Sequence, residues 1–127
     1  MQEIRLTENT STAVDVLAET LHELHHLADK TQNQYILLDL RLADMEHLRQ
    51  LILHMRDIKR IYQHQAPSFF AMVLAENMLI DIADALLKTL SQREQVQYFI
   101  NCTSATLWLR LEQKKHDQRT QSEAHAI

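Results

Sequence analysis

The chain has 127 residues, which is enough for one domain with a single hydrophobic core. Its net charge of −4, with histidines counted as neutral, argues against a non-specific nucleic-acid binder, because such proteins usually carry a basic excess. The chain contains no glycine. Walker loops and G-x-G-x-x-G turns need glycine for close backbone approach or positive φ, so nucleotide binding in those modes is excluded.

No targeting or membrane segment is predicted. The longest uninterrupted apolar stretch, Phe69–Ala75, is far shorter than the ~20 residues that a membrane-spanning helix needs. The N-terminal sequence MQEIRLTEN has no apolar core, so we do not expect a signal peptide. Because Cys102 is the only cysteine, it has no internal disulfide partner, and we expect a cytoplasmic protein.

Short apolar runs alternate with stretches that have helical spacing. Three runs predict strands: Tyr35–Leu40, Phe69–Ala75 and Gln95–Ile100. Ile4–Leu6 is a candidate for an additional first strand, and the sequence leaves open whether it pairs into the sheet. Helices are predicted over Ala13–Ala28, Asp44–Tyr62, Asn77–Ser91, and from Asn101 or Thr103 onwards.

This alternation predicts a single small α/β domain over residues 1–112, with a mostly parallel sheet of four or five strands. From Gln113 the composition becomes polar, so residues 113–127 are expected to form a frayed C-terminal tail. An all-helical bundle is the structural alternative, because the chain lacks glycine and each apolar run has only six or seven residues.

The segment His22–His26 reads HELHH and matches the zinc-hydrolase pattern H-E-x-x-H. In such enzymes the two histidines, here His22 and His26, bind zinc, and the glutamate, here Glu23, activates the metal-bound water. At about 100° per residue, however, the two histidines fall roughly 140° and 180° from Leu17, opposite the apolar side of the helix. We therefore expect a solvated face and no cofactor, with a small zinc-dependent hydrolase as the alternative function.

Polar residues follow three of the predicted strands. They are Arg41 and Asp44, then Glu76 and Asn77, then Asn101, Cys102 and Thr103. The carboxyl ends of parallel strands meet at one edge of a sheet, which is where ligands and partners bind in open α/β folds. This rim contains no Ser-His-Asp set, so it predicts binding rather than catalysis. The candidate binding surface is Arg41, Asp44, Glu76 and Asn77.

Cys102 stands at the predicted start of the last helix. The helix dipole is expected to lower the pKa of its thiol. No histidine lies beside it in sequence, so a structural role is favoured over that of a nucleophile.

Three segments together resemble small bacterial STAS-like domains, relatives of the anti-sigma-factor antagonists. The segments are YILLDLR (Tyr35–Arg41), APSFFAMVLAEN (Ala66–Asn77) and VQYFINCTSATLWL (Val96–Leu109). They are similar in order and spacing to a strand ending in Asp-Leu, a connector with a central strand, and a strand leading into an Ala-x-x-Trp-Leu-like helix. The resemblance covers Val14–Glu112, which is most of the chain.

The resemblance implies a non-enzymatic signalling or regulatory role, by docking onto a partner protein or binding a small ligand. The antagonist branch is switched by phosphorylation of a serine after the Asp-Leu strand, but this chain has no serine or threonine from Tyr35 to Pro67. We therefore expect an interaction module without that switch, whose partner is another protein or a second copy. A carrier for an apolar small molecule is a further alternative, suggested by Phe69, Phe70, Met72 and Met78, although such residues usually fill a core.

Overall fold

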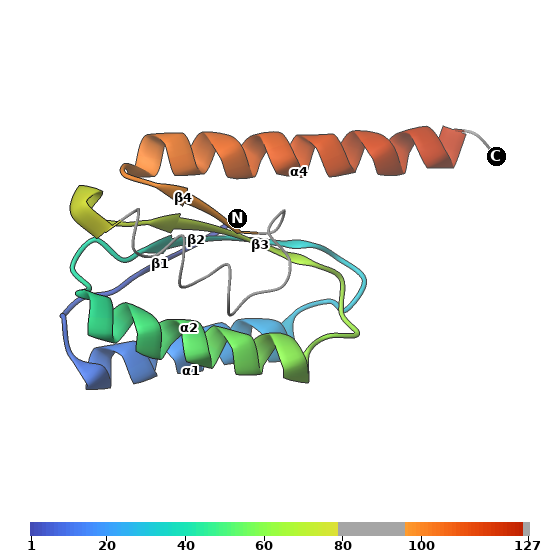
Figure 1. The fold of residues 1–127 in the computed structure, drawn as a ribbon. Helices are drawn as coiled ribbons and strands as arrows, with labels where there is room; N and C mark the ends of the chain where they lie inside the picture. The colour runs from blue at the N-terminus through green and yellow to red at the C-terminus, as the bar shows by residue number, and fades with distance from the viewer. Residues whose placement is uncertain (79–95, 126–127) are drawn as a thin grey trace.

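The structure, a computed structural model, describes residues 1–78 and 96–125, with side chains as far as Asp117. Its strands are β1 (Gln2–Arg5), β2 (Gln34–Asp39), β3 (Ser68–Val73) and β4 (Val96–Phe99). Its helices are α1 (Ser11–Leu27), α2 (Met45–Ile61), the short 3-10 helix η1 (Glu76–Met78) and α4 (Cys102–His125). Helices α1 and α2 cover one face of the sheet and α4 covers the other (Figure 1). This arrangement confirms the predicted α/β domain and excludes the all-helical bundle.

The four strands are all parallel and lie in the order β1-β2-β3-β4. The candidate first strand at Ile4–Leu6 is present as β1, which pairs with β2 in the register Gln2↔Ile36. The helix predicted over Asn77–Ser91 falls mostly outside the described residues, apart from η1 at its start. Because every strand runs in the same direction, the carboxyl ends of all four meet at one edge of the sheet (Figure 1).

Two hydrophobic cores lie on opposite faces of the sheet, and β2 and β3 contribute to both. In β2, Ile36 and Leu38 face α1 and α2, while Tyr35 and Leu37 face α4. Side chains alternate along a strand, so a strand covered on both faces needs apolar residues at every position. This explains the nearly continuous apolar run of β2, in which five of the six residues are buried.

Helices α1 and α2 begin at side chains that cap them. The Thr10 hydroxyl accepts a hydrogen bond from the Ala13 amide at 3.1 Å, and a carboxylate oxygen of Asp44 accepts one from the His47 amide at 2.9 Å. Such caps satisfy amides that have no partner within the helix. The buried side of α2 consists of the predicted inward residues Leu48, Leu51, Ile52, Met55 and Ile58.

Helix α4 packs on the sheet through Ala105 and Leu109, and it continues to His125, where the sequence predicted a frayed tail from Gln113. Residues after Leu111 include good helix formers and neither glycine nor proline. The His116 ring lies 5.0 Å from the Phe69 ring, and its Nε2 lies 3.7 Å from a Glu112 carboxylate oxygen, one turn away. The contact with Phe69 packs α4 on the sheet as far as His116, beyond the apolar segment.

The packing of α4 predicts unequal effects of two leucine truncations in the same helix. Leu109 is completely buried against the sheet, whereas Leu111 is 57% exposed. We expect Leu109→Ala to lower the free energy of unfolding by about 2–4 kcal/mol, because it leaves a cavity in the core. Leu111→Ala is the matched control, with an expected change below about 0.5 kcal/mol. Urea denaturation followed by circular dichroism measures both, and equal effects would contradict this placement of α4.

Candidate functional site

The carboxyl edge of the sheet brings together four residues that we call the Asp39 cluster: Arg5, Asp39, Arg41 and Cys102. Asp39 ends β2 and is only 3% exposed. The Arg41 guanidinium donates two hydrogen bonds to the Asp39 carboxylate, from Nε to Oδ1 at 2.9 Å and from Nη2 to Oδ2 at 2.7 Å. Arg5, at the end of β1, places its Nε 3.3 Å from the same Oδ2 atom.

Two arginines make the burial of Asp39 tolerable, since a buried carboxylate without a partner would be strongly destabilising. The hydrogen bond from Arg41 holds the pKa of the Asp39 carboxyl below its ordinary value, although burial acts in the opposite direction. The same bond raises the pKa of Arg41. Both arginine side chains remain open to solvent, at 62% for Arg5 and 48% for Arg41. The cluster therefore presents two fixed cationic groups at the surface, above one buried anion.

Cys102 lies beside this cluster, with its Sγ 3.9 Å from Oδ2 of Asp39. Burial raises the pKa of the Cys102 thiol, and the nearby negative charge of Asp39 raises it further, while Arg41 lowers it by less. The expectation that the dipole of the last helix lowers this pKa is therefore wrong. Desolvation and a nearby carboxylate both disfavour the thiolate. A thiol held in its protonated form suits a structural residue rather than a nucleophile.

The other predicted site residues do not join the Asp39 cluster. Asp44 caps α2, its amide donates to Asn9 Oδ1 at 2.9 Å, and Asn9 Nδ2 donates to its Oδ2 at 3.2 Å. These contacts tie the loop after β1 to the start of α2, and hydrogen bonding holds the pKa of Asp44 low. Glu76 and Asn77 are exposed on η1, after β3. Of the predicted surface, Arg41 is in the cluster, Asp44 is a structural cap, and η1 contributes exposed polar groups.

Two exposed apolar residues also occupy this edge, and the sequence analysis did not single them out. Leu42 directly follows Arg41 and is 56% exposed, and Ile100 directly follows β4 and is 47% exposed. Their position in the sequence, at or just after the end of a predicted strand, is the signal that could have identified Leu42 and Ile100. The edge thus combines arginines with exposed aliphatic side chains.

The HELHH segment lies where the helical geometry predicts. His22, Glu23 and His26 are all exposed on α1. Nδ1 of His22 lies 2.9 Å from the hydroxyl of Tyr62, at the end of α2. Within residues 1–78 and 96–117, no three histidine, cysteine, aspartate or glutamate side chains gather closely enough to hold a metal ion.

The middle histidine of this segment, His25, is buried, and the sequence analysis did not single it out. Its Nδ1 lies 2.7 Å from the Leu21 carbonyl oxygen and its Nε2 lies 2.9 Å from the Ser68 hydroxyl at the start of β3. Its ring lies against those of Tyr62 and Phe70. Every polar atom of this side chain has a partner in the neutral form, with Nδ1 donating and Nε2 accepting. At about 100° per residue, His25 falls only about 80° from Leu17, which could have revealed its inward position.

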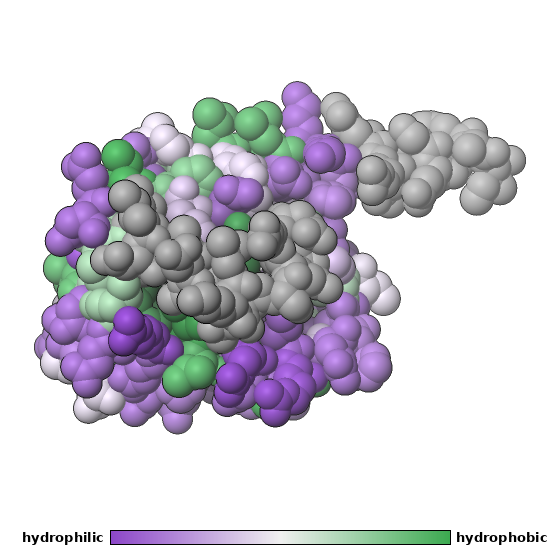
Figure 2. Space-filling view, viewed as in Figure 1, coloured by the Kyte–Doolittle hydropathy of each residue, from purple (hydrophilic) through white to green (hydrophobic). Residues whose placement is uncertain are grey.

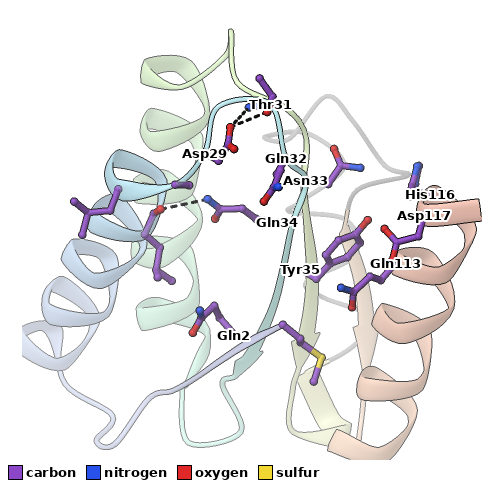
Figure 3. Close-up of a pocket in the computed structure, with 14 residues that line it drawn as sticks. Gln2, Asp29, Thr31, Gln32, Asn33, Gln34, Tyr35, Gln113, His116 and Asp117 are labelled. Atoms are coloured by element: carbon purple, nitrogen blue, oxygen red, sulfur yellow. Dashed lines mark hydrogen bonds between the residues drawn. The ribbon is translucent and has the colours of Figure 1, made fainter. Parts of the chain in front are cut away.

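A hollow of about 970 Å³ lies at the opposite, amino edge of the sheet, between the loop after α1 and α4 (Figure 3). Figure 3 shows Tyr35, Gln113 and Asp117 pointing toward one another across it. Its lining is mostly polar, with the amides of Gln32, Asn33 and Gln34 contributing from the loop and β2. Two of the four residues that suggested an apolar ligand, Phe69 and Met72, are buried in the two cores instead.

Comparison with known protein families, with curated proteins and with solved structures finds no match for the chain. The STAS-like resemblance therefore stays a prediction, which rests on the sequence segments quoted above. Among the helices described in residues 1–78 and 96–125, none has both the length and the apolar character that a membrane span requires.

The burial of His25 predicts that acid weakens the fold. Burial lowers the pKa of His25 below its ordinary value of 6.5, so the unfolded chain binds a proton more readily than the folded chain does. This contribution to stability is complete above about pH 6.5 and decreases as the pH falls toward the folded pKa. Urea denaturation between about pH 8 and pH 5 should show this loss, and His25→Gln should reduce its pH dependence.

The exposed neighbour His26 supplies the matched control for this test. His26→Gln should leave the pH dependence of the unfolding free energy close to that of the wild type. If His25→Gln and His26→Gln have the same pH dependence, the buried position of His25 does not control the acid response.

The surroundings of Cys102 predict that its thiol reacts slowly with alkylating reagents near neutral pH. The rate of alkylation by iodoacetamide, followed against pH, should show a higher midpoint for the folded chain than for the chain unfolded in urea, because only the thiolate reacts. Mass spectrometry of the alkylated chain measures both rates. A lower midpoint in the folded chain would mean that the helix terminus and Arg41 dominate, and would return Cys102 to the candidates for a reactive residue.

Proposed function

We propose that this chain is a non-catalytic regulatory interaction module that docks a partner protein through the carboxyl edge of its sheet. The observation that supports this most is the pair of solvent-open arginines, Arg5 and Arg41, oriented by the buried Asp39. Exposed Leu42 and Ile100 lie at the same edge. Arginine together with apolar side chains is the composition that favours protein interfaces over ordinary surface.

Preorganisation strengthens the case for docking. Arg41 is held by two hydrogen bonds to a buried carboxylate, so less side-chain freedom is lost when a partner contacts it. The guanidinium groups keep open edges that can meet carboxylates or backbone carbonyl oxygens of a partner. These properties fit the signalling role that the STAS-like resemblance implies, without the phosphorylated serine of the antagonist branch.

Catalysis has less support at this edge. The thiol of Cys102 has a raised pKa, and Asp39 is occupied by two arginines, so neither is poised as a nucleophile or base. The zinc-hydrolase alternative would use His22, Glu23 and His26, but all three are exposed on α1, and no third ligand stands near them in the part of the chain that the structure describes. A catalytic zinc needs three protein ligands in a shaped site.

Site-specific photocrosslinking tests the docking surface. We expect a photoreactive phenylalanine analogue at Leu42 to link the chain to a discrete protein partner in its native cells. Leu53 is the matched control, because it is similarly exposed, at 49% against 56% for Leu42, but lies on α2. Mass spectrometry identifies the linked protein, and the purified pair is then assayed for binding. We expect Arg5→Ala to weaken that binding, because it removes one of the two exposed guanidinium groups. We expect Glu76→Lys to alter the binding, because it reverses a charge exposed after β3 at the same edge.

Asp44 is unsuitable for charge reversal here, because its replacement would also remove the cap of α2. Glu76 has no such role, since it lies exposed on η1. Crosslinking at Leu53 but not at Leu42, or binding that neither Glu76→Lys nor Arg5→Ala alters, would remove the carboxyl edge from consideration.

A further inference from the structure

The outward side of α4 carries a mixed apolar and basic surface, which we call the α4 stripe: Leu107, Arg110, Leu111, Lys114 and Lys115. Leu107 and Leu111 are 58% and 57% exposed, and the three basic residues are exposed as well. Figure 2 shows apolar surface along α4, next to hydrophilic side chains. The two leucines stand one helical turn apart, so they share a face.

Neither leucine is needed by the core. The opposite side of α4 fills the sheet interface with Ala105 and Leu109, both fully buried. Trp108, on the flank, turns its ring toward Phe69 and Phe99. Single exposed leucines are ordinary, but a pair on one helix face beside three basic residues is typical of a contact surface. The acidic residue next along this side of α4, Asp117, lines the hollow at the amino edge of the sheet.

The basic residues of the stripe also form no ion pair within the described residues. Among the ion pairs of residues 1–78 and 96–117, none includes Arg110, Lys114 or Lys115. The nearby Glu112 lies outside the stripe, and its carboxylate pairs with His116 one turn further along α4. Three cations that have no ion-pair partner among the described residues are thus gathered on one face of a chain whose net charge is −4.

We infer that the α4 stripe binds an acidic amphipathic helix of a partner protein. The partner's apolar residues would pack between Leu107 and Leu111, and its carboxylates would meet Arg110, Lys114 and Lys115. A second copy of this chain fits poorly, because two stripes would set cations against cations. A lipid surface fits poorly too, because two leucines without an outward aromatic residue give little apolar area to insert. This surface is separate from the carboxyl edge, so the inference goes beyond the proposed function.

Selection from a displayed library of helical peptides tests this inference with a defined probe. Peptides of about 15 residues, near the shortest length at which isolated helices hold, are panned on the full chain. We expect the enriched peptides to be acidic, with apolar residues three or four positions apart. Their affinity should fall about tenfold or more in the double variant Leu107→Ser with Leu111→Ser, because apolar contact area is lost.

A second variant keeps the test independent of folding effects. Arg110→Glu with Lys114→Glu retains both leucines, and it should weaken the same peptides and reduce the dependence of their affinity on salt. Leu53→Ser, at a comparably exposed leucine of α2, is the matched control and should bind them as the wild type does. Circular dichroism checks that each variant is folded.

Several outcomes would overturn the inference. The stripe is rejected as an acidic-helix site if no peptides are enriched or if the enriched peptides are not acidic. It is also rejected if the enriched peptides bind both stripe variants as tightly as they bind the wild type. A dimer seen by light scattering that the leucine variant abolishes would assign the stripe to a second copy. Stripe-dependent binding to phosphatidylglycerol vesicles would assign it to a membrane surface instead.

Discussion

Burial of the central strands on both faces is the constraint on which the rest of this structure depends. Because successive side chains of β2 and β3 point to opposite sides, each strand must supply two cores at once. Asp39 ends the apolar run that begins at Tyr35 in β2, and it lies on the face covered by α4. Its carboxylate cannot reach bulk water, so the chain provides arginines from β1 and from the following loop. The exposed arginines of the proposed docking surface are thus present because a buried carboxylate ends β2 and needs cationic partners.

The sequence revealed the elements of the fold more readily than the site. The apolar runs identified β2, β3 and β4 to within two residues at each end. In β2 and β3 the signature is nearly continuous because both faces of these strands are buried. Helical spacing also placed His22 and His26 on the solvent side of α1 correctly. What the sequence did not reveal was the partnership of Arg5 with Asp39, which depends on parallel pairing between segments more than 30 residues apart.

Cys102 and His25 show why local reasoning fails for single ionisable groups. A helix start by itself argues for a more acidic thiol, yet burial of the Cys102 side chain, together with the charge of Asp39, which is distant in sequence, raises its pKa instead. His25 sits within a segment that reads as a metal-binding motif, but the start of β3 provides its hydroxyl partner, Ser68. In both cases burial and a neighbour from another element set the behaviour of the group, and only the folded arrangement supplies them.

Among the described strands, β1 lies at one edge of the sheet, which affects how the protein behaves when crowded. An open strand edge exposes unpaired amides and carbonyls, and other chains can add to it as further strands. Here the edge strand has only four residues, Gln2–Arg5, and three of them are polar or charged. Short length and charge are two devices by which natural sheets resist such addition. Arg5, one of the two arginines that pair with Asp39, therefore also helps to prevent other chains from adding to this edge.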